Sequence, residues 1–278
     1  MKKTMNKTKK QFSNFHSHTT WCDGKNTVDE MVTEAIRLGC PQFGFSGHSP
    51  TGSGETYTIR RQNIKKYIAD VNAAKEKYRD KIEIFCGIEQ DFFTPEAPDA
   101  YEYVIGSVHS IEKNGKRYSV DHNAETQKLT SDEVFGGDFY EYAGAYFDTV
   151  IKQAAKGGFD ILGHIDLVAK FNEKERFFDE SDPRYKKKAL EALESYSGKT
   201  VVVEINSGAL SRGYREEFYP AAFLLERVSE MKMPVVFSSD CHSKAHILFG
   251  FEKMRELAKK YKLTVIEDMR DILKYTRG

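Results

Sequence analysis

The sequence predicts a parallel α/β barrel that gathers metal ions at one end. Short apolar runs alternate with longer amphipathic runs, which is the pattern of strand–helix units in a parallel sheet. Histidine and carboxylate side chains follow these short runs, at or just beyond the point where each predicted strand ends. In a parallel barrel those ends lie on one face, so side chains from distant segments converge there.

The length suits one barrel domain. α/β barrels commonly reach the size of this chain of 278 residues as a single unit. We expect one domain over residues 12–278. The preceding residues 1–11, MKKTMNKTKKQ, are basic and lack the apolar segment of a signal peptide, so a disordered tail is predicted.

Seven strands and six helices are predicted in alternation. The first helix, Val28–Leu38, begins with Thr27 and Glu30 in capping-box spacing and ends at Gly39. The strands are Ser13–Phe15, Gln42–Phe45, Ile82–Cys86, Tyr103–Ile105, Asp160–Leu162, Val201–Ile205 and Val235–Phe237, with a weaker eighth run at Leu263–Ile266. The other helices are Arg60–Tyr78, Phe139–Lys156, Arg184–Tyr196, Pro220–Met231 and Glu252–Lys260. Three long polar connections, Thr51–Ile59, Glu112–Asp138 and Asn206–Tyr219, are predicted to form the walls of a substrate pocket.

Composition narrows the class of protein. The 42 basic and 42 acidic residues balance, which gives no sign of a nucleic-acid or membrane surface. No apolar run is long enough to cross a membrane. The four cysteines form no CxxC pair, so a reducing, cytoplasmic setting is expected. The sequence does not indicate an oligomeric state.

Nine potential metal ligands lie at or after six predicted strands. His16 and His18 alternate on an extended segment, so both rings can face one ion. The full set is His16, His18, Asp23, His48, Glu89, His109, His164, Asp240 and His242. Imidazole suits zinc, iron and manganese, and carboxylates can bridge two ions. Nine donors exceed what one ion needs, so two or three ions are expected.

This ordered set resembles the polymerase-and-histidinol-phosphatase (PHP) superfamily. The segments FHSHTTWCDGKNTVDEMVTEAIRLG and FGFSGHSP are similar to its histidinol-phosphatase branch. The resemblance covers about residues 13 to 270 and implies a distorted, TIM-like (β/α)7 barrel with a three-metal centre. It also implies L-histidinol phosphate as substrate and a role in histidine biosynthesis.

The resemblance also implies how the ligands divide. His16, His18, Glu89 and Asp240 would hold one ion, and Glu89 would bridge to a second ion held by His109 and His164. Asp23, His48 and His242 would hold a third. Many superfamily members have histidine where Asp23 stands, but aspartate is frequent in the histidinol-phosphatase branch. A harder oxygen ligand at this position would alter the identity or affinity of the third ion.

The expected reaction is hydrolysis of a small phosphate ester. Metal ions generate hydroxide near neutral pH and neutralise phosphate oxygens, so we expect hydroxide bridging the first two ions to attack phosphorus. Glu89 is therefore predicted to be catalytic. Asp240, His242 and a metal-bound water are alternatives for the acid that protonates the leaving group. Cys241 is expected to be a packing residue.

Basic residues would complete the phosphate site. The resemblance suggests Arg212, whose guanidinium geometry suits phosphate, and Lys170 is a second candidate. Arg117 and Arg215 are weaker candidates. The cationic amine and imidazole of histidinol would need acidic or aromatic neighbours, for which Glu112, Tyr118 and Asp121 are available.

Three other functions remain open at this point. A PHP phosphoesterase could act on another small phosphate or on nucleotide ends, although a nuclease would need a basic groove. A metal-dependent amidohydrolase would share the HxH pair and the late aspartate, but Glu89 or His109 takes the place of its usual bridging lysine. A non-catalytic metal-binding module would need only one closed four-ligand shell.

Overall fold

A computed structural model of the chain describes residues 11–51, 56–94 and 100–278. The tail predicted at residues 1–11 therefore falls almost wholly outside the described residues. The tail and the single domain over residues 12–278 stay predictions. Part of the predicted connection 51–59 is also outside the described residues.

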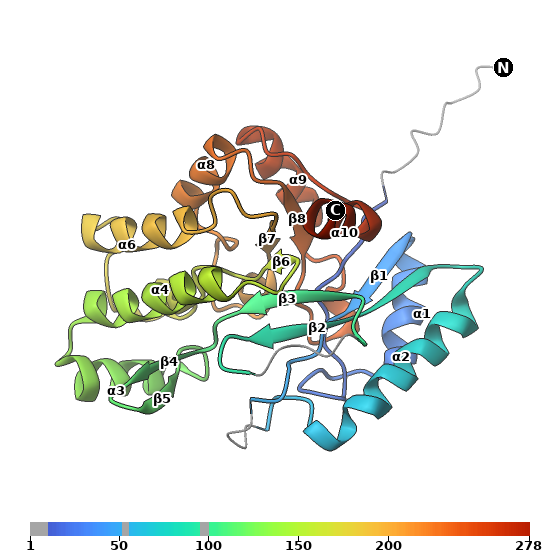
Figure 1. The fold of residues 1–278 in the computed structure, drawn as a ribbon, viewed down its shortest axis with the longest axis horizontal. Helices are drawn as coiled ribbons and strands as arrows, with labels where there is room; N and C mark the ends of the chain where they lie inside the picture. Colours follow the sequence, from blue (N-terminus) through green and yellow to red (C-terminus); the bar gives the residue numbers. More distant parts are fainter. Residues whose placement is uncertain (1–10, 52–55, 95–99) are drawn as a thin grey trace.

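A curled parallel sheet forms the centre of the molecule (Figure 1). Its strand order is β1-β2-β3-β6-β7-β8, and every neighbouring pair is parallel. The strands are β1 (Gln42–Phe45), β2 (Glu83–Asp91), β3 (Tyr103–Ser107), β6 (Ile161–Leu162), β7 (Val202–Asn206) and β8 (Val235–Ser238). Nearly all strand residues are buried, as expected for a parallel sheet covered on both faces.

The N-terminal segment joins the two edge strands of this sheet. Asn14 forms a parallel bridge with Phe43 of β1, and Ser17 forms one with Cys241, just beyond β8. The Gly44 amide donates to the Asn14 carbonyl at 2.8 Å, and the His18 amide donates to the Cys241 carbonyl at 3.0 Å. The predicted strand Ser13–Phe15 is thus present only as an isolated bridge at Asn14, and the curled α/β arrangement of the predicted distorted barrel is confirmed with six parallel strands.

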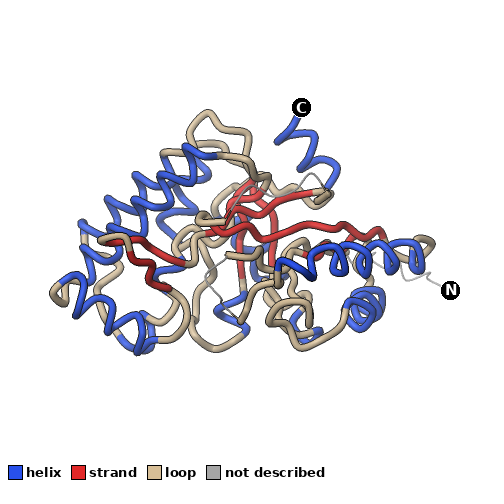
Figure 2. Tube along the Cα trace, turned by 60° about the horizontal axis from the view of Figure 1, so that its bottom comes forward, coloured by secondary structure: helices blue, strands red, loops and turns tan. Residues whose placement is uncertain are grey.

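Helices surround the strands on the outside (Figure 2). The longer ones are α1 (Val28–Leu38), α2 (Ile64–Tyr78), α3 (Ala124–Phe135), α4 (Phe139–Lys156), α6 (Pro183–Glu194), α8 (Ala222–Glu230), α9 (Phe251–Lys260) and α10 (Met269–Arg277). Short turns are η1 (Arg61–Asn63), η2 (Leu167–Ala169), α5 (Asn172–Glu175), α7 (Gly208–Ser211) and η3 (Lys244–His246). The predicted capping box of α1 is present, and Gly39 ends the helix in the left-handed conformation.

The predicted long connection Glu112–Asp138 is wrong as an irregular loop. It contains most of an antiparallel hairpin, β4 (Ser110–Lys113) and β5 (Lys116–Ser119), followed by α3. Asn114 and Gly115 form its two-residue turn, with φ values of 54° and 73°. Asn-Gly is a strong hairpin signal because both turn residues need positive φ.

Two smaller differences lie near the C-terminus. The weak eighth run, Leu263–Ile266, does not form a strand. Only Val265 pairs with the sheet, in an isolated parallel bridge to Val235 at the start of β8. Helix α10 was not predicted. Arg277 and Thr276 of this helix bind the buried carboxylate of Asp160, just before β6.

No helix in the described part of the chain is long and apolar enough to cross a membrane.

Candidate metal centre

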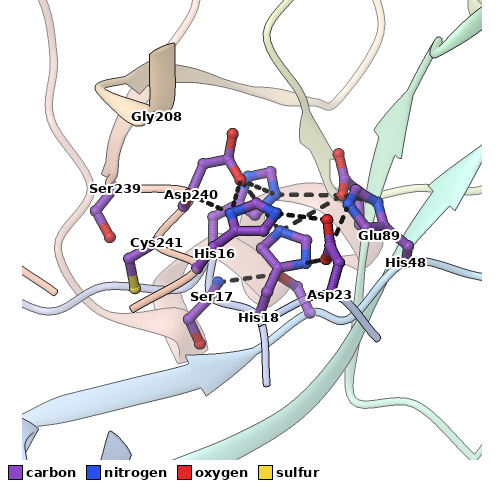
Figure 3. Close-up of polar contacts among 12 residues, drawn as sticks. His16, Ser17, His18, Asp23, His48, Glu89, Gly208, Ser239, Asp240 and Cys241 are labelled. Carbon is purple, nitrogen blue, oxygen red and sulfur yellow. Dashed lines mark hydrogen bonds and ion pairs between the residues drawn. The ribbon is translucent and has the colours of Figure 1, made fainter. Parts of the chain in front are cut away.

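The structure brings all nine predicted ligands together at the C-terminal ends of the strands. Donor atoms within 4.8 Å of one another form four overlapping groups. These groups are His18–Asp23–His48–His242, His16–His18–Glu89, His16–His164–Asp240 and His48–Glu89–His109. Each predicted ligand belongs to at least one group. Figure 3 shows the rings of His16 and His18 between Asp240 on one side and Glu89 on the other.

Glu89 is the hub of the cluster. It lies inside β2, two residues from its end, rather than after the strand, because β2 extends beyond the predicted Cys86. Its carboxylate lies within 4 Å of a ring nitrogen of five histidines. The shortest separations are 2.6 Å to His48 Nδ1, 3.0 Å to His164 Nε2 and 3.2 Å to His109 Nε2. One buried carboxylate thus faces donors from four segments of the chain.

The Glu89 charge is compensated by these rings. Burial by itself would raise the pKa of the carboxyl, but the charges of His48, His109 and His16 hold it well below its usual range. Glu89 is therefore ionised at neutral pH, which is the form that binds metal ions.

A second carboxylate, Asp240, completes the opposite side. Its Oδ1 lies 3.1 Å from His18 Nε2 and 3.7 Å from His16 Nε2. Asp240 has a φ of 47°, a left-handed conformation that Asp adopts more readily than most residues. Gly208 packs against this carboxylate so closely that a Cβ there would lie 2.3 Å from Oδ2. The close approach at Gly208 requires glycine.

The third side is formed by Asp23, His48 and His242. Asp23 Oδ2 lies 3.1 Å from His242 Nε2, and Oδ1 lies 3.7 Å from His48 Nε2. His18 also reaches this group, because its Nδ1 lies 3.8 Å from Asp23 while its Nε2 faces Asp240. Burial and the neighbouring His242 and His48 lower the pKa of His18 to about 3, so its ring is neutral. A neutral imidazole is the form that coordinates metals.

The buried donors fit bound metal ions. His16 Nε2 and His18 Nε2 are buried and make no hydrogen bond within the described residues. Leaving such polar atoms without a partner costs about 1–3 kcal/mol each. Cations between these nitrogen atoms and the carboxylates of Glu89 and Asp240 would satisfy both rings, so the mixed imidazole and carboxylate set suits zinc and similar ions.

Two further carboxylates orient the ligands, and the sequence interpretation missed both. Glu204 Oε2 lies 2.8 Å from His16 Nδ1, and its Oε1 accepts the His164 amide at 2.7 Å. Asp91 Oδ2 lies 3.3 Å from His109 Nδ1 and accepts the His109 amide at 2.9 Å. In both cases Nδ1 faces the carboxylate and Nε2 faces the cluster. Glu204 is the only charged residue in the apolar predicted strand Val201–Ile205, and this was the signal by which the sequence could have revealed it.

The predicted phosphate-binding residues lie in different surroundings. Arg212 contacts the cluster directly: its Nη2 donates to Asp240 Oδ2 at 3.1 Å, and its Nη1 lies 2.7 Å from His242 Nδ1. Lys170 contacts Asp121 instead, donating to its carbonyl at 2.9 Å and to its Oδ2 at 3.3 Å. The structure therefore places Arg212 at the cluster and Lys170 beside an acidic neighbour.

The weaker candidates, Arg215 and Arg117, make contacts away from the cluster. Arg215 is buried and donates to Glu180 and to the Ala169 carbonyl, which joins the segments after β6 and β7. Arg117, which belongs to the hairpin β4–β5, lies over the ring of Phe93. Burial raises the pKa of the Cys241 thiol to about 12, which agrees with a packing role.

Replacing Glu204 with glutamine tests the orienting carboxylate. The amide loses the charge that fixes the His16 ring, so we expect metal affinity to fall about ten- to hundred-fold. Competition with a fluorescent chelator measures this affinity. Glu194→Gln, an exposed change on α6, is the matched control. Equal affinities for the two variants would contradict the role of Glu204.

The chain is similar in sequence to proteins of one known family. The PHP domain family matches residues 14–208. A Deinococcus radiodurans protein named "probable histidinol-phosphatase" is 27% identical over 251 residues, covering 85% of this chain and 88% of that protein. A Bacillus subtilis histidinol-phosphatase is 22% identical over 263 residues, covering 87% and 97%.

Solved structures show the same fold. A protein from Listeria monocytogenes superposes with a TM-score of 0.75 at 23% identity, covering 87% of this chain and 99% of its own. A histidinol phosphate phosphatase from Lactococcus lactis, solved with zinc, L-histidinol and phosphate, gives a TM-score of 0.70 at 20% identity, covering 92% and 95%. From the family match over well more than half of its length, this chain belongs to the PHP domain family.

Proposed function

We propose that this protein is a histidinol-phosphatase, which hydrolyses L-histidinol phosphate to L-histidinol and phosphate in histidine biosynthesis. The observation that carries the proposal is the convergence of nine metal donors around buried Glu89, with the Arg212 guanidinium in direct contact with two of them. Relatives named histidinol-phosphatase, and a similar fold solved with L-histidinol and phosphate, support the choice of substrate.

The proposed centre holds two or three ions. His16, His18, Glu89 and Asp240 would hold the first, Glu89, His109 and His164 the second, and Asp23, His48 and His242 the third. Bound ions would acidify water near neutral pH and neutralise the phosphate oxygens. Zinc is supported by the Lactococcus lactis structure, and manganese and iron are alternatives that the same donors accept.

The side chains would do the remaining work. Glu89, held ionised by its histidines, supplies the negative charge shared by two of the ion sites. Arg212 presents two donors beside Asp240 and His242, and a phosphate dianion binds such a fork well. Either Asp240 or His242, which flank Arg212, would take up the proton released by the attacking water and return it to the leaving oxygen. Lys170 is proposed as a second cation for the phosphate.

The surroundings of the reaction are also part of the proposal. The substrate is a small phosphate ester, and a cytoplasmic location follows from the biosynthetic role. No nucleic-acid partner is expected from the balanced charge of the chain.

Phosphate release tests this function. We expect metal-dependent release from L-histidinol phosphate, well above that from p-nitrophenyl phosphate and sugar phosphates. Chelation should abolish it, and zinc or manganese should restore it. Glu89→Gln should be inactive because the shared carboxylate charge is lost. Metal-dependent activity on other esters alone would assign another PHP phosphoesterase, and no ester hydrolysis would reopen the amidohydrolase and the non-catalytic metal-binding module.

Arg212→Ala tests the phosphate site. A hydrogen bond between charged groups contributes about 1.5–3 kcal/mol, so kcat/KM should fall by roughly ten- to hundred-fold, mainly through KM. Arg184→Ala, at the exposed start of α6, is the control. Metal content should be measured in parallel, because Arg212 also contacts Asp240. Unchanged kinetics at full metal content would remove Arg212 from the phosphate site.

A further inference from the structure

One carboxylate beside the metal centre is left unexplained by metal binding. Asp121 follows the hairpin β4–β5, and the amide of Val120 donates to the carbonyl of the ligand His109 at 2.9 Å. Asp121 therefore directly follows Val120, whose backbone is hydrogen-bonded to the ligand His109. It belongs to none of the metal-donor groups found in the described residues.

The position of Asp121 is built into the fold. Buried Gln127 of α3 donates through Nε2 to the carbonyls of Val120 and Val168, at 3.0 and 2.8 Å. This amide ties the end of the hairpin to the segment that follows β6. The two segments carry Asp121 and Lys170, so their side chains meet as a consequence of the backbone arrangement.

Asp121 is ionised and retains acceptor capacity. Partial burial alone would raise the pKa of its carboxyl, but the Lys170 ammonium, 3.3 Å from Oδ2, holds that pKa below its usual value. Lys170 donates to Oδ2, and the Ser119 hydroxyl donates to Oδ1. A carboxylate has about four acceptor positions, so positions remain for another donor. The side chain is 24% exposed, which leaves it open to a ligand.

The space beside the Asp121 carboxylate already holds one ammonium group, that of Lys170. The Nζ of Lys170 lies 5.4 Å from the Phe171 ring centroid and 5.3 Å from that of Tyr214. Tyr214 is 38% exposed, so part of this aromatic site is open to solvent. A carboxylate with aromatic rings beside it is a favourable environment for a cation. Lys170 occupies it as an internal ligand.

From these contacts we propose that Asp121 selects phosphate esters whose leaving group carries a positive charge. The substrate ammonium binds the acceptor positions of the Asp121 carboxylate that Lys170 leaves open, and the neighbouring Lys170 ammonium weakens this binding by sharing the same negative charge. Glu112 and Tyr118, the other residues considered for this role, lie within the hairpin strands, where Glu112 is exposed. This inference rests on the phosphatase activity proposed above and names the residue that discriminates among its substrates.

Matched substrate pairs test the selection. The first pair is L-histidinol phosphate and its N-acetyl derivative, and the second is ethanolamine phosphate and ethyl phosphate. The quantity measured is the ratio of kcat/KM for the cationic ester to that for the neutral ester. Taking this ratio cancels any effect on phosphate binding, including one from Lys170.

We expect Asp121→Asn to lower this ratio by about ten-fold or more, the size of one charged hydrogen bond. Lys170→Met should raise it, because the competing cation is removed. Glu112→Gln removes an equal charge from the same hairpin and should leave the ratio as in the wild type. A ratio unchanged in Asp121→Asn, or lowered in Lys170→Met, would overturn the inference.

Two further readouts separate this inference from the proposed function. If histidinol phosphate is not hydrolysed but ethanolamine phosphate is preferred over ethyl phosphate through Asp121, the substrate assignment fails and the inference stands. Calorimetric titration with L-histidinol and N-acetyl-L-histidinol needs no turnover. If Asp121→Asn weakens the binding of L-histidinol but not that of N-acetyl-L-histidinol, the inference is supported. If the wild type and the variant bind L-histidinol equally well, the inference is overturned.

Discussion

The buried negative charge of Glu89 is the constraint on which the rest of this site depends. A carboxylate without solvent contact is strongly destabilising unless cations or polar hydrogens surround it. Five histidines surround it, from the N-terminal segment and from the ends of β1, β3 and β6, and the charges of His48, His109 and His16 compensate it. The same rings leave buried nitrogen atoms without hydrogen bonds, which bound metal ions would satisfy. The fold and the proposed metal ions therefore both compensate the buried negative charge of Glu89.

Barrel closure delivers these donors. The N-terminal segment has to bridge β1 and the end of β8 for His16 and His18 to face Glu89 and Asp240 at once. Glu204 of β7 then binds both His16 and the backbone of His164, so that adjacent strands fix each other's ligands. Gly208 lets the backbone after β7 approach the Asp240 carboxylate closely. Small residues and internal carboxylates thus set the geometry that the ligands alone would not hold.

Much of this arrangement could be predicted from the sequence, because strand ends in a parallel barrel converge by topology. The nine ligands needed only their positions along the chain, and the strand–helix alternation needed only periodicity. The positions of Glu204 and Asp91 follow from contacts between strands that are distant in sequence, so residue type alone did not reveal their role. The meeting of Asp121 with Lys170, and of Arg215 with Glu180, depends on how two connections pack. The hairpin turn at Asn114 and Gly115 carried a local signal that the sequence interpretation did not use.

The most direct test of the account is the metal content of the purified protein, measured by plasma mass spectrometry after growth with zinc, manganese and iron available. Nine converging donors predict two or three ions per chain, because a single ion takes only four to six ligands. A content of at most one ion per chain, in protein that is folded and saturated with metal, would contradict a polynuclear centre organised around Glu89.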